Sequence, residues 1–245
     1  MVLAESMLRI PIYFLWVATW LGSMGLIAYI LKKKLNRDYP IFFLFVVAEC
    51  ATDTLNFCLS FGSYPAYYYI YWIGTAITTV LGFAVLHEVF SVVFRPYEGL
   101  RSFGSNLFRW STVVLLMIGA VMALSSPSVI ENPVTNFIFT IDRSVRLMQC
   151  GLVVFLYLFG RQLGLTDSHR VFGISIGFGV TAGVHLSVVT LRSMFTSDLS
   201  VYLLNGMNQI AFLAAVVVWT VYMYRREPER RRASVLDQPE SWNYA

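Results

Sequence analysis

Charged side chains are scarce in this sequence. Asp, Glu, Lys and Arg make up only 13% of its 245 residues, while 57% of the residues are apolar. A typical soluble protein has about 25% charged residues. The mean hydropathy of the chain is +0.64. This composition excludes a soluble enzyme, a disordered regulator and a secreted disulfide scaffold, and it predicts a membrane protein.

Several chemistries also lack the residues that they need. All lysines lie together at Lys32–Lys34, in a predicted loop, so no lysine within a membrane span is available to bind retinal. The sequence has no P-loop, kinase signature, HExxH motif or serine-hydrolase elbow at a strand-to-helix turn. Its 3 cysteines form no CxxC pair and are expected to be small apolar core residues. We therefore predict no enzymatic activity, no cofactor and no metal site.

Long apolar stretches are abundant, and seven of them approach or exceed the length of about 20 residues that crosses a bilayer. They lie at about 11–31, 40–61, 68–94, 109–127, 134–160, 171–192 and 200–224. Helices satisfy their own backbone polar groups in lipid. We therefore expect an all-α polytopic membrane protein, with a bundle of seven transmembrane helices in residues 1–224 and a short basic tail at 225–245.

The basic residues predict the orientation of this bundle. The loops after the first, third and fifth stretches and the tail together hold 14 of the 18 Lys and Arg residues. By the positive-inside rule these segments face the cytoplasm, which leaves the N-terminus outside and the C-terminus in the cytoplasm. The rule also accounts for the net positive charge, so the expected partner is the lipid bilayer and no nucleic acid is needed.

Polar side chains recur on one face of several predicted helices, because positions i, i+4 and i+7 share a helix face. Three stripes of this kind are Glu49, Asp53 and Asn56; Asp142, Arg146 and Gln149, with Arg143 alongside; and Asn205, Asn208 and Gln209. At similar depth, the sixth stretch adds His185, and the third adds Thr75 and Thr78.

Charges at this depth must be compensated. The five charged side chains of the first two stripes would cost on the order of 10 kcal/mol if they faced lipid. We expect Asp53 to pair with Arg146, because the guanidinium group can bind a carboxylate through two N–H groups, and Glu49 to lie near Gln149. Three interpretations stay open: a structural ion network, a ligand or ion site that opens outward, and arginines that reach the interface.

A second polar group lies near the predicted cytoplasmic side. His87 and Glu88 are adjacent in the third stretch, and Arg95 follows Glu88 by roughly two helical turns. We expect Glu88 to pair with a basic residue at the cytoplasmic end. The hypothesis for this group is a structural or gating role.

The sixth stretch is rich in glycine, at Gly173, Gly177, Gly179 and Gly183. Small residues four positions apart let a neighbouring helix approach closely. This spacing predicts close packing inside the bundle, with a homodimer through this helix as the alternative.

Short segments spread along the chain carry a family resemblance. They are Arg95-Pro96-Tyr97 with Leu100-Arg101, Phe108-Arg109-Trp110, residues 142–149, Val171-Phe172-Gly173-Ile174 and Trp242-Asn243. With these segments the chain resembles an uncharacterised family of bacterial seven-transmembrane-helix inner-membrane proteins. The resemblance implies a multi-pass protein of the bacterial cytoplasmic membrane and suggests no activity.

The polar stripes favour a sensory or small-ligand-binding function. A small polar or anionic ligand would reach Arg143 and Arg146 from the outer face, with Glu49 and Asp53 as counter-charges. One alternative is a small proton-coupled transporter in which Glu49 or Asp53 carries the proton. Another is a non-catalytic subunit of a larger membrane complex.

Overall fold

The computed structural model describes residues 2–60, 64–93, 133–159, 169–192 and 198–225, together with residues 106, 110, 113, 114 and 117. Within this part of the chain all regular structure is helical, and no strand is present. The predicted all-α class is therefore confirmed for the described residues.

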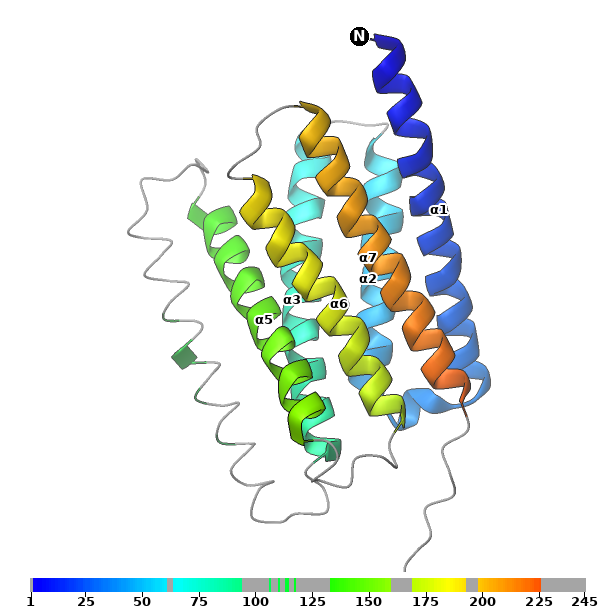
Figure 1. The fold of residues 1–245 in the computed structure, drawn as a ribbon, viewed down its shortest axis with the longest axis vertical. Coiled ribbons are helices and arrows are strands. Elements are labelled where there is room, and N and C mark those ends of the chain that lie inside the picture. The colour runs from blue at the N-terminus through cyan, green and yellow to red at the C-terminus, as the bar shows by residue number, and fades with distance from the viewer. Residues whose placement is uncertain are drawn as a thin grey trace, which may run out of the picture.

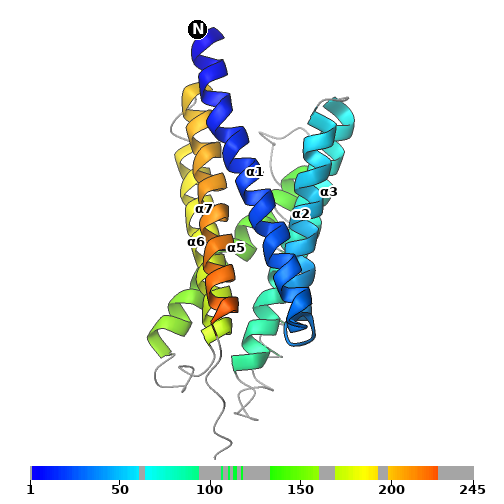
Figure 2. The ribbon, with the colours of Figure 1, turned by 90° about the vertical axis from the view of Figure 1, so that its right-hand side faces the viewer.

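The described bundle consists of long helices that lie roughly along one axis (Figure 1). They are α1 (Val2–Lys32), α2 (Pro40–Ser60), α3 (Tyr64–Val93), α5 (Pro133–Phe159), α6 (His169–Arg192) and α7 (Asp198–Tyr224), and the 3-10 turn η1 (Leu35–Arg37) joins the first two. Each long helix overlaps one predicted stretch. Helix α2 packs on α3 and α6 packs on α7 (Figure 2), while α5 contacts α3 and α6.

Five of these helices contain stretches long and apolar enough to cross a membrane. These stretches are Tyr13–Lys32, Pro40–Leu59, Ala66–Val93, His169–Arg192 and Tyr202–Tyr224. Helix α5 has 27 residues, which is also sufficient length, but it carries Asp142, Arg143 and Arg146. The chain is thus a multi-pass membrane protein, as its composition predicts.

The fourth predicted stretch, 109–127, lies outside the described residues except for Trp110, Val113, Val114 and Met117, which are helical. Helices α3 and α5 run in the same direction, so Val93 and Pro133 lie at opposite ends of the bundle (Figure 1). One further crossing of the membrane by the chain between α3 and α5 would require the two ends to lie on opposite sides in this way. The count of seven helices and the orientation stay predictions, and the tail beyond Arg225 also lies outside the described residues.

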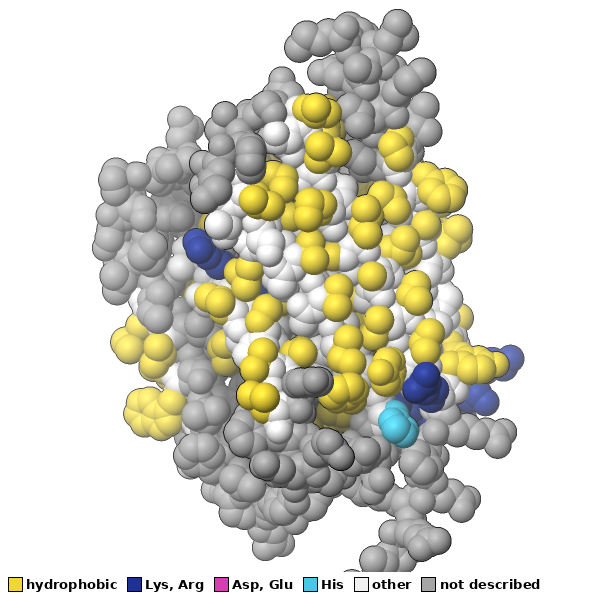
Figure 3. Space-filling view, in the orientation of Figure 1, with side chains coloured by type: hydrophobic (Ala, Val, Ile, Leu, Met, Phe, Trp, Pro, Cys, Tyr) yellow, Lys and Arg dark blue, Asp and Glu magenta, His cyan; other side chains and the backbone are white. Residues whose placement is uncertain are grey.

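The outer faces of the helices are apolar. The side of the bundle formed by α1, α6 and α7 is covered with hydrophobic side chains, and Lys and Arg side chains gather mainly near its lower edge (Figure 3). Exposed residues such as Phe14, Leu21, Leu203 and Val217 belong to this surface type. An apolar surface of this extent is typical of contact with lipid rather than with water.

Helix α2 begins with a cap that another helix supplies. The N–H groups in the first turn of a helix have no intrahelical partner. Those of Ile41 and Phe42 donate to the two carboxylate oxygens of Glu88 on α3, at 3.0 and 2.9 Å. The negative charge of Glu88 also lies at the positive end of the α2 dipole. The buried Glu88 therefore joins α2 and α3 at this end of the bundle.

Large aromatic side chains fill the interior of the bundle in the half where α2 begins and α7 ends. We call Phe42, Phe45, Phe178 and Trp219 the aromatic layer; all are buried, and they come from α2, α6 and α7. The ring centroids of Phe45 and Phe178 are 4.9 Å apart, and those of Phe178 and Trp219 are 5.3 Å apart. These tilted contacts are the geometry that aromatic rings prefer. The layer joins three helices without any polar group other than the Trp219 indole N–H.

Glycines on α6 make the close approach of α7 possible. The Trp219 indole lies against Gly177 and donates from Nε1 to the carbonyl oxygen of Ile174 at 3.1 Å. Gly173 faces Tyr222 of α7, and Gly179 faces Val153 of α5. The predicted packing of this helix inside the bundle is confirmed at these glycines, and the homodimer through α6 stays a prediction.

We expect Gly177→Ala to destabilise the fold and Gly183→Ala to leave it nearly unchanged. A Cβ at position 177 would lie 2.0 Å from Nε1 of Trp219, whereas a Cβ at position 183 meets nothing within 4 Å. Displacing the indole should cost about 1–3 kcal/mol, and the change at the open position should stay within about 0.5 kcal/mol. Unfolding in detergent followed by circular dichroism measures both. Equal stabilities would contradict the described packing of α6 on α7.

We also expect Glu88→Ala to lower the free energy of unfolding by about 2 kcal/mol, because two buried N–H groups lose a charged acceptor. Ser91→Ala, an exposed position on the same helix, is the matched control and should have little effect. The same unfolding measurement compares them, and a loss no larger than that of the control would show that the cap does not stabilise α2.

Candidate functional site

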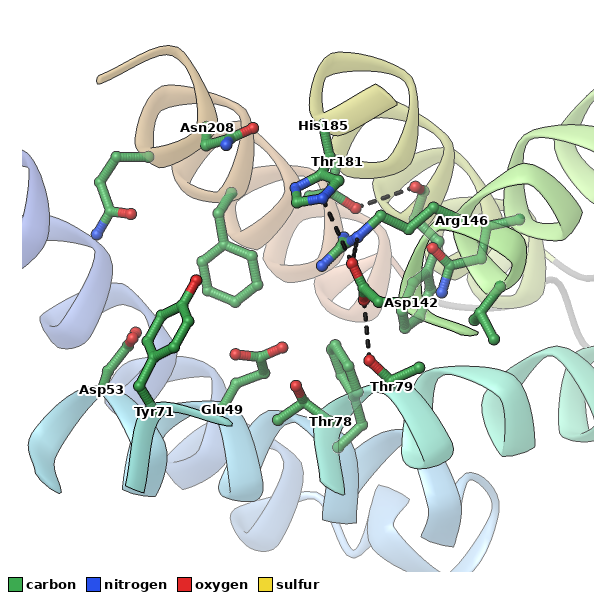
Figure 4. Close-up of a pocket in the computed structure, with 16 residues that line it drawn as sticks. Glu49, Asp53, Tyr71, Thr78, Thr79, Asp142, Arg146, Thr181, His185 and Asn208 are labelled. Carbon is green, nitrogen blue, oxygen red and sulfur yellow. Dashed lines mark hydrogen bonds and ion pairs between the residues drawn. The ribbon is translucent and has the colours of Figure 1, made fainter. Parts of the chain in front are cut away.

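A polar cavity of about 250 Å³ lies between the helices. Its walls come from α2, α3, α5, α6 and α7 (Figure 4). The polar lining residues are Glu49, Asp53, Tyr71, Thr78, Thr79, Asp142, Arg146, Gln149, Thr181, His185, Asn208 and Gln209, and the apolar ones are Phe45, Val145, Phe178 and Phe212. Most residues of the predicted polar stripes thus meet around one space.

Asp142 makes the densest set of contacts in this cavity (Figure 4). Its Oδ2 accepts a hydrogen bond from Nε of Arg146 at 2.9 Å and lies 3.4 Å from Nε2 of His185 on α6. Its Oδ1 accepts a hydrogen bond from the Thr79 hydroxyl of α3 at 2.9 Å. One buried carboxylate therefore links α3, α5 and α6. Charge-assisted hydrogen bonds of this kind are stronger than neutral ones.

The ion pair differs from the predicted one. Arg146 bonds to Asp142, one turn earlier on its own helix, and not to Asp53 of α2. Two residues four positions apart on a helix already face each other, so this pair forms without any constraint on how α2 and α5 are rotated. Glu49 and Gln149, which we expected to lie near each other, both line the cavity.

Glu49 and Asp53 face the cavity from α2, and both are partly buried (Figure 4). Thr78 of α3 lies beside Glu49 in this wall. Among the residues that the structure describes, no Lys or Arg side chain forms an ion pair with either carboxyl group. A carboxylate within a membrane requires compensation by a cation or a proton, and the described side chains do not supply it fully.

The side chain of Gln149 also has an acceptor oxygen without a described hydrogen-bond donor. The residue is 4% exposed and lines the cavity from α5. Its Oε1 accepts no hydrogen bond from any described residue. Buried side-chain oxygens are nearly always hydrogen-bonded in folded proteins. Gln149 therefore places an unsatisfied acceptor in the wall of the cavity.

Thr75, whose hydroxyl donates to the carbonyl oxygen of Tyr71 at 2.9 Å, and three further predicted residues do not line the cavity. Arg143 is exposed, because adjacent helix positions point about 100° apart and Asp142 faces inward. Asn205 is also exposed and accepts a hydrogen bond from Nη2 of Arg192. Asn56 lies on α2 beyond the cavity, with its buried Oδ1 lacking a described donor.

His87 and Glu88, which the sequence predicts near the cytoplasmic side, lie in different surroundings in the structure. Glu88 caps α2 through backbone N–H groups and forms no ion pair with a basic residue in the described part of the chain. His87 is exposed on α3, and Arg95 lies outside the described residues. The structural role expected for Glu88 is visible in this cap, whereas gating stays a prediction.

Sequence reasoning missed several lining residues. Thr181 lies one turn before His185 on α6, and that spacing alone could have identified it. Tyr71 belongs to an aromatic stretch typical of a membrane interface, yet it extends into the cavity (Figure 4). Phe212 gives no polar signal at all, and it joins Phe45 and Phe178 in the apolar part of the wall.

The described residues contain no group of three or more His, Cys, Asp or Glu side chains that could hold a metal ion. Asp142 and His185 meet as a pair only. In its described part the cavity therefore offers hydrogen-bonding groups, carboxyl groups and aromatic rings, which suit an organic molecule better than a tightly bound metal.

Comparison with models of known protein families, with curated proteins and with solved structures finds no match for this chain. The resemblance to a bacterial inner-membrane family therefore stays a prediction, and the functional argument depends on the cavity itself.

We expect Asp142→Ala to be strongly destabilising. It leaves the Arg146 guanidinium without its acceptor and removes the link between α3 and α6, which should cost about 3 kcal/mol. The double variant Asp142→Ala/Arg146→Ala should lose less, because no uncompensated charge remains. Arg143→Ala, at the neighbouring exposed position, is the control for a lost charge. Thermal unfolding in detergent tests this order, and similar effects of Asp142→Ala and Arg143→Ala would contradict it.

Proposed function

We propose that this chain is a small-ligand-binding membrane protein with a sensory function, and that the cavity between α2, α3, α5, α6 and α7 is its binding site. The observation that carries the proposal is a polar cavity of about 250 Å³ that is lined by Glu49, Asp53 and the incompletely satisfied Gln149. Ligand pockets usually measure about 300–1,000 Å³, so the expected ligand is small.

A purely structural network explains only part of this cavity. Asp142, Arg146, Thr79 and His185 satisfy one another. Glu49, Asp53 and Gln149 lie outside that set of contacts, although they line the same space. Polar networks that serve only stability are normally satisfied throughout, because each unmet group costs free energy. The remaining groups favour a bound molecule.

The position of the aromatic layer supports entry of a ligand into the cavity from one end of the bundle. Phe45 and Phe178 belong to both the layer and the cavity wall, and Trp219 packs against them. Asp53 lies toward the C-terminal end of α2 and Asn208 toward the N-terminal end of α7, which share the end of the bundle where α1 begins (Figure 1). With the predicted orientation, that end faces outside.

A ligand in this position would touch five helices at once. Binding shifts a conformational equilibrium only when the ligand contacts differ between the two states. Groups from α5 and α6 meet at Asp142, and groups from α2 lie across the cavity. A ligand that bridges the two sides would favour the state in which α2 lies close to α5, and this change is the proposed signal.

Proton-coupled transport is the second candidate. The observation that favours it is the pair of carboxyl groups at Glu49 and Asp53, which form no ion pair with a described Lys or Arg side chain. Uptake into proteoliposomes that requires a pH gradient would favour a transporter, and saturable binding without uptake would favour a receptor.

We expect the purified protein to retain a small molecule that Thr78→Phe excludes. Thr78 lines the cavity, so a phenyl group there takes up ligand space, whereas Ile77→Phe adds the same group at a neighbouring exposed position. Native mass spectrometry from a mild detergent should show an adduct in the wild type and in Ile77→Phe but not in Thr78→Phe.

Two results would contradict the proposed site. One is an adduct that persists equally in Thr78→Phe. The other is a bare wild-type chain to which no compound of a metabolite mixture binds in a dose-dependent way.

A further inference from the structure

The charges around the cavity are unbalanced. Three carboxyl groups line it, from Glu49, Asp53 and Asp142, and the only guanidinium group among the described lining residues is that of Arg146. Arg146 already bonds to Asp142 at 2.9 Å, and His185 also contacts that carboxylate. An excess of two carboxyl groups over guanidinium groups attracts a cation and repels an anion.

The excess carboxyl groups lie close enough to act together. Glu49 and Asp53 are four positions apart on α2, which places their Cβ atoms about 5–6 Å from each other. Both face the cavity (Figure 4). One positively charged group can therefore contact both carboxyl groups, neither of which forms an ion pair with a described Lys or Arg side chain.

Aromatic rings complete the surroundings of this position. Tyr71 and Phe212 line the cavity, and Phe45 and Phe178 form its apolar part. The faces of such rings attract cations within about 6 Å, and organic ammonium groups are the ligands most often held in this way. A divalent metal ion would instead need more oxygen or nitrogen ligands, and the described residues contain no group of three.

We infer that the ligand of this cavity is a small organic ammonium ion, with Glu49 and Asp53 as its anionic partners. The inference rests on the proposed binding function and adds the charge of the ligand. It differs from the expectation of an anionic ligand because Arg143 faces away and Arg146 is held by Asp142.

Three probes of nearly the same shape separate charge from size. Choline is the cation, and 3,3-dimethylbutan-1-ol, which we call the alcohol, is its neutral carbon isostere. The corresponding carboxylate, 3,3-dimethylbutanoate, is the anion. Isothermal titration of the full-length protein in nanodiscs should give saturable choline binding at least about tenfold tighter than that of the alcohol. The anion should show no saturable binding.

Variants assign this preference to the two carboxyl groups. Glu49→Gln and Asp53→Asn should each weaken choline binding about tenfold, while binding of the alcohol stays unchanged. Unchanged alcohol binding also shows that each variant keeps its cavity. Asp38→Asn, at an exposed acidic residue next to η1, is the matched control and should bind choline as the wild type does.

The outcomes separate this inference from the proposed function. Equal or tighter binding of the alcohol or the anion, lost in Thr78→Phe, would overturn the ammonium assignment and leave the binding site intact. Choline binding that is unaffected in both carboxyl variants would overturn the roles of Glu49 and Asp53. Saturable binding of none of the probes would overturn the inference, and the retained-adduct experiment would then decide on the binding function alone.

Discussion

Compensation of charge inside a membrane is the constraint on which this structure depends. Asp142 cannot face lipid, so it collects donors from three helices: the guanidinium of Arg146, the imidazole of His185 and the hydroxyl of Thr79. These contacts hold α5 against α3 and α6, although α5 carries the charged side chains of Asp142, Arg143 and Arg146 within its length. Helices within lipid gain little from the hydrophobic effect when they associate. Polar contacts of this kind therefore contribute both to the association of the helices and to their register.

Other contacts between helices also give polar atoms inside the bundle a hydrogen-bond partner. At one end of the bundle, Glu88 of α3 satisfies the first backbone N–H groups of α2. In the same half of the bundle, the Trp219 indole fits against Gly177 and donates to a backbone carbonyl oxygen. Each arrangement pairs a polar atom across two helices. Against this background, the unsatisfied Oε1 of Gln149 is an exception, and Glu49 and Asp53 in the same cavity wall form no ion pair with a described Lys or Arg side chain.

The sequence predicts the helices well because length and apolar composition suffice for a membrane span. The described helices α2 and α3 begin and end within a few residues of the predicted stretches. Periodicity also brings Glu49 and Asp53 to one face. The pairing of Arg146 could not be predicted in this way, since both Asp53 and Asp142 were available and a helix that is apolar on most sides gives little information about its rotation.

The same limit explains the other differences. The spacing predicts Asn205 on a polar face, and Arg143 is expected alongside another, yet both side chains are exposed. Tyr71 and Phe212 line the cavity, although aromatic residues in a membrane span more often contact lipid. Which side of a helix meets a neighbour is decided by packing with residues distant in sequence. Only the three-dimensional arrangement shows that the lining carries an excess of acidic groups.

The aromatic layer also has an electrical consequence. A membrane potential falls mainly across the least polar section of a protein, and moving one charge through 100 mV costs about 2.3 kcal/mol. In this bundle that section is formed by Phe42, Phe45, Phe178 and Trp219. A charged molecule that enters from the predicted outer side and stops in the cavity has not passed the layer, so most of the voltage still lies ahead of it. Local charges, rather than the membrane potential, then set how fully the cavity is occupied.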